Sequence, residues 1–231
     1  MGSDTLVNPS MEDVLVSWSG GKDSCLALYE LQRAGRHRVA ALLTTVTKDY
    51  DRVSMHGVRR ALLERQAEAL GLPLRQVPIP KGASNEEYEG EMAAAFSEYR
   101  EGGVEEVVFG DLFLEDVRAY RERFLSRHGM RGLYPVWMRD TAEFVRRFIA
   151  LGFRAVVTCV DSAALDGSFA GRLIDEEFLA SLPPGVDPCG ERGEFHSFVF
   201  AGPSFKDEVG FTVGERVFRD SFWFCDLVPE G

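Results

Sequence analysis

Short apolar runs alternate with longer amphipathic segments along the first two-thirds of the chain. The apolar runs cover residues 14–18, 39–46, 74–79, 104–110 and 154–160. Apolar residues at helical spacing fill residues 22–31, 57–71, 84–102 and 141–152. Strands that alternate with helices require parallel pairing, because each crossover needs a helix to cover the sheet. The pattern predicts an α/β fold with a doubly wound, mainly parallel sheet of about five strands, Rossmann-like and of the HUP type.

The pattern changes after about residue 160. Residues 175–205 lack a regular hydrophobic period and are rich in Pro and Gly. Alternating apolar residues around Gly214 predict a hairpin within residues 211–228. We therefore expect residues 13–160 to form the main domain and residues 161–231 a small α+β part packed against it. Residues 1–12 lack the basic and apolar regions of a signal peptide and are predicted to be a disordered lead-in.

Composition narrows the functional classes. The chain has 45% hydrophobic and 27% charged residues and a net charge of -11. Such a surface repels polyanions, so general nucleic-acid binding is not expected. No run approaches the roughly 18 apolar residues of a membrane span, and we expect a cytoplasmic protein without a membrane partner. The four cysteines are widely spaced and include no CxxC, which favours buried free thiols over a zinc or redox site: Cys25, Cys159, Cys189 and Cys225.

The first predicted strand leads into the sequence SGGKDS, residues 19–24. In an open parallel sheet the first strand-to-helix turn is the usual phosphate site. Gly20 and Gly21 allow close backbone approach, and the start of the next helix offers N–H groups to an anion. The spacing excludes both a Walker A loop and a dinucleotide fingerprint, because Val16 stands five residues before Gly21 and the next glycine is Gly35.

The side chains of this turn suit a nucleotide phosphate. The hydroxyls of Ser19 and Ser24 can hold phosphate oxygens, and Lys22 adds a cation. Asp23 would repel phosphate alone, which makes it a candidate Mg²⁺ ligand. A plain glycine-rich turn with Asp23 near a helix start is the alternative.

Topology adds candidates at neighbouring strand ends. The end of the second strand should pass the nucleotide base, which points to Leu43 and Thr44. The fourth strand ends at Gly110 and Asp111, where a glycine lets a ligand approach and a carboxylate can meet metal or ribose. An exposed turn aspartate is the alternative for Asp111.

The motif S-G-G-x-D-S directly after a first strand resembles the pyrophosphate-binding loop of the N-type ATP pyrophosphatases, also called the PP-loop or adenine nucleotide alpha hydrolase-like superfamily. In that group the loop grips the β and γ phosphates of ATP while a substrate oxygen attacks the α phosphorus. The resemblance implies ATP and Mg²⁺ as cofactors. It also makes Lys22 and Asp23 the expected catalytic residues of the loop.

Two further segments resemble the diphthine-ammonia ligase family. Residues 109–137 are similar to that family's G-D-I segment followed by G-L-x-P-L-W, and residues 187–200 (DPCGERGEFHSFVF) are similar to its C-G-E-x-G-E-[FY]-H-T stretch. Ser197 stands where the family usually has threonine, which keeps the hydroxyl. The resemblance spans the chain from about residue 14 to 228.

The resemblance implies an ATP-dependent amide ligase. A carboxylate would be adenylated with release of pyrophosphate, and ammonia taken from free ammonium would then displace AMP. The family's acceptor is diphthine, a modified histidine of elongation factor 2. Glu194 and His196 would be catalytic. The residues implied on the substrate side are His56, Arg118, Cys189, Gly190, Glu191, Gly193 and Glu194.

Several alternatives remain open. A ligase of the same family could act on a different carboxylate. A tRNA thiolation enzyme uses the same loop, but it usually needs a cysteine pair and a basic docking surface. A non-catalytic nucleotide-binding module would not require Lys22, Asp23 and both serines. Residues 187–196 could also form only a tight turn into a strand, and apolar positions in residues 211–228 could belong to the core or to a homodimer contact.

Overall fold

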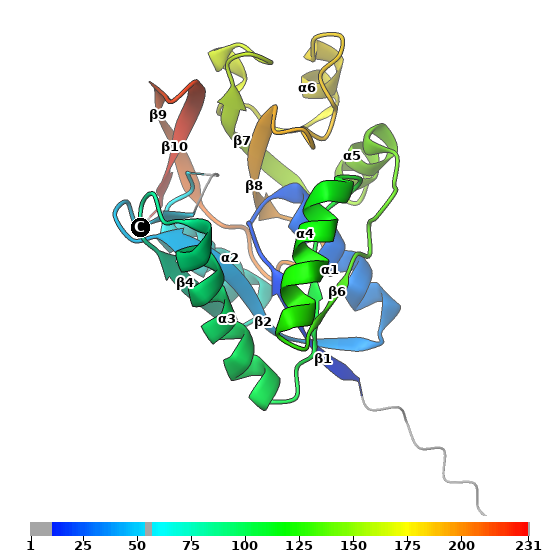
Figure 1. Cartoon of the computed structure of the whole chain (residues 1–231). Helices are drawn as coiled ribbons and strands as arrows, with labels where there is room; N and C mark the ends of the chain where they lie inside the picture. Colours follow the sequence, from blue (N-terminus) through cyan, green and yellow to red (C-terminus); the bar gives the residue numbers. More distant parts are fainter. Residues whose placement is uncertain (1–10, 54–56, 231) are drawn as a thin grey trace, which may run out of the picture.

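The computed structural model describes residues 11–53 and 57–230 (Figure 1). The elements are β1 (Glu12–Ser17), α1 (Lys22–Ala34), β2 (His37–Thr47), β3 (Arg52–Val53), α2 (Arg60–Leu70), β4 (Leu74–Ile79), α3 (Asn85–Glu101), β5 (Glu106–Val108), α4 (Glu115–Arg127), β6 (Arg131–Leu133), α5 (Thr141–Ala150), β7 (Arg154–Asp161), η1 (Gly167–Phe169), α6 (Glu176–Ser181), β8 (Phe195–Ala201), β9 (Phe211–Arg219) and β10 (Phe222–Pro229). Residues 1–10 of the expected lead-in, and His56, lie outside the described residues, whereas Glu12 already belongs to β1.

The first sheet is mainly parallel, as predicted. Strand β1 pairs in parallel with β2 and β5, β2 pairs in parallel with β4, and β5 with β6, which gives the order β4-β2-β1-β5-β6. The two-residue β3 adds an antiparallel pair at the end of β2. Strand order therefore reverses between β1 and β5, and ligands of open α/β sheets bind beside such a switch point.

The two faces of this sheet are covered by different layers. Alternate residues of a strand point to opposite faces, so Leu15 packs with α3 and α4 in one core cluster while Val14 and Val16 join the other. That second cluster contains α1 and α2 and also Val156 and Phe198 of a further sheet. Both sheets thus share one continuous core.

The further sheet is antiparallel, in the order β8-β7-β10-β9. The interpretation of residues 154–160 as a strand of the parallel sheet was wrong: β7 pairs with β8 and β10. The fifth parallel strand is β6, whose three residues are too few to show a period. The predicted hairpin is β9–β10, but its turn lies at Asp220 and Ser221, with φ of 51° and 69°, and Gly214 lies inside β9.

Several helix ends carry the signals that stop and start helices. Ser84 and Glu87 form a capping box at the start of α3. Asp140 accepts a hydrogen bond from the backbone N–H of Glu143 at the start of α5. Gly35 and Gly71 end α1 and α2 in the left-handed conformation. These local signals fix where the helices begin and end along the chain.

Across residues 11–53 and 57–230, no helix combines the length and apolar content needed to cross a membrane. All four cysteines are buried and free, as predicted. The edge strand β9 exposes Val213, Val217 and Phe218 by half or more, and association through this strand stays a prediction.

The buried side chain of Gln66 in α2 joins three separate parts of the chain. Its Oε1 accepts a hydrogen bond from Trp18 Nε1 at 2.8 Å, and its Nε2 donates to the carbonyls of Gly20 at 3.0 Å and Val199 at 2.6 Å. Trp18 and Gly20 belong to the connection after β1, and Val199 belongs to β8. Buried amides of this kind are stabilising only when their partners are all present.

Replacement of Gln66 by leucine should leave the Trp18 N–H and the Val199 carbonyl without this partner. We expect the free energy of unfolding to fall by about 2–4 kcal/mol, because each buried unsatisfied group costs about 1–3 kcal/mol. The measurement is urea denaturation followed by circular dichroism. The matched control is Gln76→Leu on β4, where the amide makes an exposed contact with Glu64. Equal stability of the two variants would contradict the role given to Gln66 in joining these three segments.

Candidate active site

A cleft of about 450 Å³ opens at the carboxyl ends of β1, β2 and β5. Register explains why these ends meet: Ser17 lies beside Leu43, and Val16 lies beside Val108. Most of the residues singled out from the sequence line this cleft: Ser19, Lys22, Asp23, Ser24, Leu43, Thr44, Gly110, Asp111, Gly190, Glu191, Gly193 and His196. Segments far apart in the sequence are therefore brought to one place.

The loop of residues 19–24 is organised by its own hydroxyls. Ser19 Oγ accepts a hydrogen bond from the backbone N–H of Gly21 at 3.2 Å. Ser24 Oγ donates to the carbonyl of Gly21 at 3.0 Å and lies 3.2 Å from Ser19 Oγ. Gly20 has a φ of +76°, and a Cβ there would stand 2.8 Å from the side chains of Gln66 and Leu63. Only glycine fits this position without strain.

Strand β8 of the antiparallel sheet holds the same loop from the other side. The backbone N–H of Lys22 donates to Ser197 Oγ at 3.2 Å, and the N–H of Val199 donates to the carbonyl of Gly20 at 2.9 Å. Ser197 is buried. The start of α1 therefore has a fixed orientation before any ligand binds, with its N–H groups and positive dipole end at the cleft.

Lys22 and Asp23 form an ion pair at the base of the cleft. Lys22 Nζ lies 2.9 Å from Asp23 Oδ2, and the lysine side chain is only 3% exposed. Burial opposes the charge of Lys22, but the neighbouring Asp23 carboxylate outweighs this and the pKa of Lys22 rises. Burial raises the pKa of Asp23, the Lys22 charge opposes that shift, and Asp111 adds to it. A second cation beside Asp23 would relieve this crowding of carboxylates.

The end of β5 packs directly on the first turn of α1. A Cβ on Gly110 would stand 2.7 Å from the carbonyl carbon of Asp23 and 2.8 Å from the nitrogen of Ser24. The next residue, Asp111, pairs with Arg121 of α4 at 2.9 Å. Arg121 also covers the ring of Phe109 at 4.4 Å. Asp111 is thus oriented at the cleft by α4 rather than being an exposed turn residue.

An apolar wall and one polar group surround the end of β2. Leu43 and Thr44 line the cleft with Tyr88, Met92 and Phe109. Thr44 Oγ1 is buried and has no hydrogen-bond partner within the described residues. A hydroxyl of this kind beside aromatic rings suits a purine base, which needs stacking and a polar contact.

Residues 187–194 form a tight loop that returns to β8. Asp187 Oδ1 accepts from the N–H of Cys189 at 2.8 Å, and its Oδ2 accepts from Thr141 Oγ1 at 2.8 Å. Glu194 is buried and accepts from the N–H groups of Asp187 and Arg192, both at 3.0 Å. Both Glu194 oxygens are therefore engaged in shaping the loop, and Glu194 does not line the cleft. Its catalytic role stays a prediction.

Glu191 and His196 face the cleft with altered acidities. Burial raises the pKa of Glu191 to about 7, and the Asp23 charge adds to the shift. Its Oε1 accepts from the N–H of Leu112 at 2.8 Å, so the side chain bridges to the end of β5. Burial, assisted by the charge of Lys22, lowers the pKa of His196 to about 4. At neutral pH the imidazole is uncharged.

Besides Glu194, two of the expected substrate-side residues do not reach the cleft. Arg118 lies over the rings of Tyr134 at 4.5 Å and Trp137 at 4.7 Å, outside the cleft lining. Cys189 is fully buried, and its Sγ donates to the carbonyl of Thr141 at 3.0 Å. Burial raises the pKa of the Cys189 thiol, so it is not a nucleophile at neutral pH. A role of Arg118 or Cys189 in substrate binding stays a prediction.

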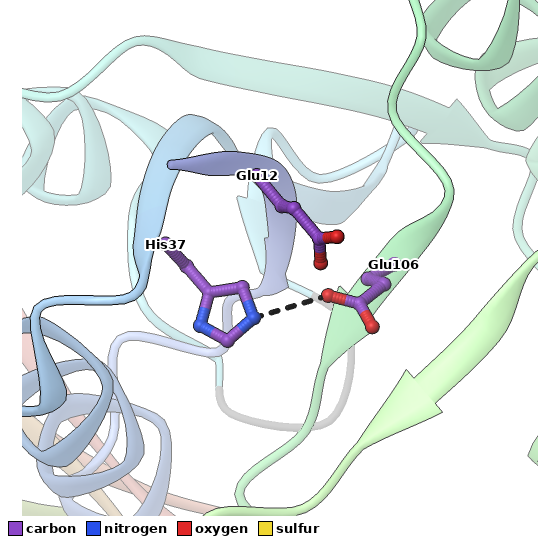
Figure 2. Close-up of side chains that lie close together, drawn as sticks. All are labelled: Glu12, His37 and Glu106. Carbon is purple, nitrogen blue, oxygen red and sulfur yellow. Dashed lines mark ion pairs between the residues drawn. The ribbon is translucent and has the colours of Figure 1, made fainter. Parts of the chain in front are cut away.

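A separate cluster of Glu12, His37 and Glu106 lies at the amino ends of β1, β2 and β5 (Figure 2). His37 Nε2 lies 3.2 Å from Glu106 Oε2, and the three ligand atoms lie within 4.8 Å of one another. Arg131 already donates to Glu106 at 2.6 Å and lies 3.8 Å from Glu12. Together with Arg131, these residues are the first residues of β1, β2, β5 and β6. The cluster is therefore an ion-pair network that joins the strand starts, away from the cleft.

The sequence analysis assigned no role in the site to three residues that shape it. Gln66, Ser197 and Arg121 hold the loop, the helix start and Asp111, respectively. Ser197 was noted only for its hydroxyl. Gln66 had a usable signal, because a glutamine on the apolar face of a helix is unusual.

Glu191→Gln should change how stability depends on pH in nucleotide-free protein with EDTA. Below pH 4.5 the carboxyl is protonated in both folded and unfolded states. Between pH 4.5 and 7 the unfolded state ionises first, so wild type loses stability as pH rises. Glutamine keeps the acceptor for Leu112 but cannot ionise. The variant should therefore gain about 2–3 kcal/mol relative to wild type between pH 5 and 8.

Urea denaturation at several pH values measures this difference. Glu91→Gln, an exposed substitution on α3, is the control and should follow wild type at every pH. A constant difference between Glu191→Gln and wild type across this range would show that Glu191 ionises normally.

Comparison with known proteins places this architecture in a family. Residues 12–132 match the diphthamide synthase N-terminal domain, and residues 140–228 match the diphthamide synthase C-terminal domain. The chain is 27% identical over 233 residues to diphthine--ammonia ligase of Homo sapiens, covering 90% of this chain and 86% of that protein. It is 28% identical over 231 residues to diphthine--ammonia ligase of Danio rerio, covering 90% of each.

Two further comparisons are more distant or partial. The chain is 26% identical over 228 residues to diphthine--ammonia ligase of Schizosaccharomyces pombe, covering 90% of this chain but 38% of that protein. The crystal structure of a predicted subunit of tRNA methyltransferase from Methanocaldococcus jannaschii aligns with a TM-score of 0.43 and 16% identity over 63% of this chain and 80% of the other, which is too remote to bear on function. With both family domains matched in order, the chain belongs to the diphthamide synthase family and is an ATP-dependent ligase that forms carbon–nitrogen bonds.

Proposed function

We propose that this enzyme adenylates a carboxylate and then replaces AMP by ammonia, with diphthine on elongation factor 2 as the acceptor. The observation that carries the proposal is the loop of residues 19–24 at the topological switch point, held on both sides and open to the cleft. The acceptor is taken from the printed names of the relatives.

The loop supplies the groups that a pyrophosphate leaving group needs. The start of the 13-residue helix α1 offers backbone N–H groups, and Lys22 lies buried beside them. A cation held in a buried site interacts strongly with the charge that develops as pyrophosphate leaves. Thr44 and the aromatic wall would hold the adenine, which leaves the α phosphate near the middle of the cleft.

The residues present also fit a magnesium ion. Asp23 Oδ1 is buried and lacks a hydrogen-bond partner within the described part of the chain, and Asp111 lies on the same cleft. Carboxylate oxygens together with phosphate oxygens are the usual ligands of Mg²⁺. Asp23, with Asp111 as the second candidate, would hold the ion, and the ion would neutralise phosphate charge. This also explains why a carboxylate stands in a phosphate-binding loop.

The proposed reaction has two bond exchanges. A carboxylate oxygen of the acceptor forms a bond to the α phosphorus, and the bond to the pyrophosphate oxygen breaks with its electron pair. The nitrogen of ammonia then attacks the acyl carbon, and AMP leaves to give the amide. Ammonium must lose a proton first, and Glu191 and His196, which line the cleft, would assist this proton loss. Glu194 would act indirectly, by fixing the loop that carries Glu191.

The nucleotide products from ATP labelled at the α or γ phosphate test this proposal. Wild type with Mg²⁺, ammonium and elongation factor 2 bearing diphthine should form AMP and pyrophosphate. Asp23→Asn should lower that rate about 100-fold or more, because a loss of about 3 kcal/mol of transition-state stabilisation is typical for such a group. Asp207→Asn, an exposed change outside the cleft, should leave the rate unchanged.

Each outcome of the product assay has a distinct meaning. AMP formation only with another carboxylate would keep the chemistry and replace the acceptor. Formation of ADP, or AMP formation that persists in Asp23→Asn, would overturn the adenylation proposal.

A further inference from the structure

The ion-pair network at the amino ends of β1, β2 and β5 brings an imidazole together with two carboxylates. Parallel pairing sets Glu12 beside His37 and Val14 beside Glu106. Because alternate residues of a strand share a face, Glu12 and Val14 point to the same side of the sheet. The side chains of Glu12, His37 and Glu106 therefore converge from three strands, as Figure 2 shows.

One buried oxygen of this network lacks a partner. Glu106 is only 6% exposed, and its Oε1 accepts a hydrogen bond from Arg131 Nε at 2.6 Å. Its Oε2 has no hydrogen-bond partner within the described residues, although His37 Nε2 lies 3.2 Å away. A buried carboxylate oxygen is costly unless a donor or a cation satisfies it. A metal ion placed between Oε2 and Nε2 would satisfy both atoms.

The spacing of the ligand atoms suits a small divalent ion. Zn²⁺ binds nitrogen and oxygen ligands at about 2.0–2.2 Å in tetrahedral geometry, which places the ligand atoms about 3.3–3.5 Å apart. The contact between His37 and Glu106 is already close to this spacing, and all three ligand atoms lie within 4.8 Å of one another. The side chain of Glu12 is 65% exposed, so it can rotate to close the remaining distance.

The charges around the network favour a cation. A cavity of about 280 Å³ beside it is lined by four carboxylate side chains, against the single cation of Arg131: Glu12, Asp13, Glu105 and Glu106. Arg38 neutralises Asp13 at 2.6 Å. The Arg131 side chain is 61% exposed, so water screens its charge, and it binds the Glu106 oxygen that does not face His37. Glu12 and Glu105 thus leave an excess of negative charge in the cavity.

We propose that Glu12, His37 and Glu106 bind a divalent transition-metal ion, with Zn²⁺ as the ion that fits best and water completing its coordination. Imidazole is a good ligand for such ions, whereas Mg²⁺ and Ca²⁺ prefer sites made of oxygen alone. The ion joins the starts of three strands and stabilises the fold. The proposal is independent of the proposed function, because none of these residues lines the nucleotide cleft.

Calorimetric titration of the untagged, nucleotide-free chain with Zn²⁺ at neutral pH tests this site. His37→Gln and Glu12→Gln should each weaken the affinity for Zn²⁺ about 10-fold or more, because each removes one of three ligands. Glu12 is exposed, so its replacement keeps the test valid if His37→Gln folds poorly.

Thermal unfolding gives a second readout, because an ion that binds only the folded chain raises its Tm. At free Zn²⁺ about 100-fold above the wild-type Kd, the Tm of wild type should rise by about 5 °C or more. In His37→Gln and Glu12→Gln the rise at the same Zn²⁺ concentration should be about half of that or less.

Two control variants separate this site from other carboxylates. Glu105→Gln removes the same charge from the same cavity without removing a ligand, and it should change the affinity by less than about 3-fold. Asp23→Asn alters the nucleotide cleft and should leave the affinity of this site unchanged.

Three results would overturn the proposal: absence of saturable Zn²⁺ binding, equal affinity in wild type and in both ligand variants, or Mg²⁺ binding as tight as that of Zn²⁺. In the first case a proton on His37, rather than a metal ion, would lie between the imidazole and Glu106. Failure of AMP formation in the product assay would leave this result untouched, because Zn²⁺ binding is measured without nucleotide or acceptor.

Discussion

The position of the loop after β1 is the constraint on which the rest of the site depends. Its Gly20 carbonyl accepts hydrogen bonds from Gln66 of α2 and from the backbone of Val199 in β8. Ser197, two residues earlier in β8, accepts from the first residue of α1. Because these contacts come from α2 and from β8 of the other sheet, the loop can be in place only when both sheets are assembled. The antiparallel sheet therefore helps to build the candidate nucleotide site and also forms its far wall.

Two adjoining cavities follow from this arrangement. The cleft over α1 has a buried lysine, carboxylates and helix N–H groups, which suit phosphates and a metal ion. The neighbouring cavity has Lys81 and Arg219 near the ring of Tyr50, at 5.0 Å and 5.4 Å from the ring centre. His196 lies between the two cavities, uncharged at neutral pH because of burial.

The sequence predicted most of the fold and the centre of the site, and the misses have physical reasons. The SGGKDS loop could be found because its residue types are local and their chemistry is specific. The sequence could not show which of the two sheets contains β7, because a run of buried apolar residues packs equally well in parallel and antiparallel sheets. The role of Glu194 depends on loop hydrogen bonds to Asp187 and Arg192, which no spacing rule predicts.

The most direct measurement is the crystal structure of the enzyme with α,β-methylene-ATP and Mg²⁺. The account predicts the β and γ phosphates at the N–H groups of residues 19–24 beside Lys22, with adenine against Thr44 and Phe109. It also predicts that Ser197 keeps its hydrogen bond to the start of α1. A nucleotide whose phosphates lie in the neighbouring cavity, or one that binds only after β8 separates from the loop, would contradict it.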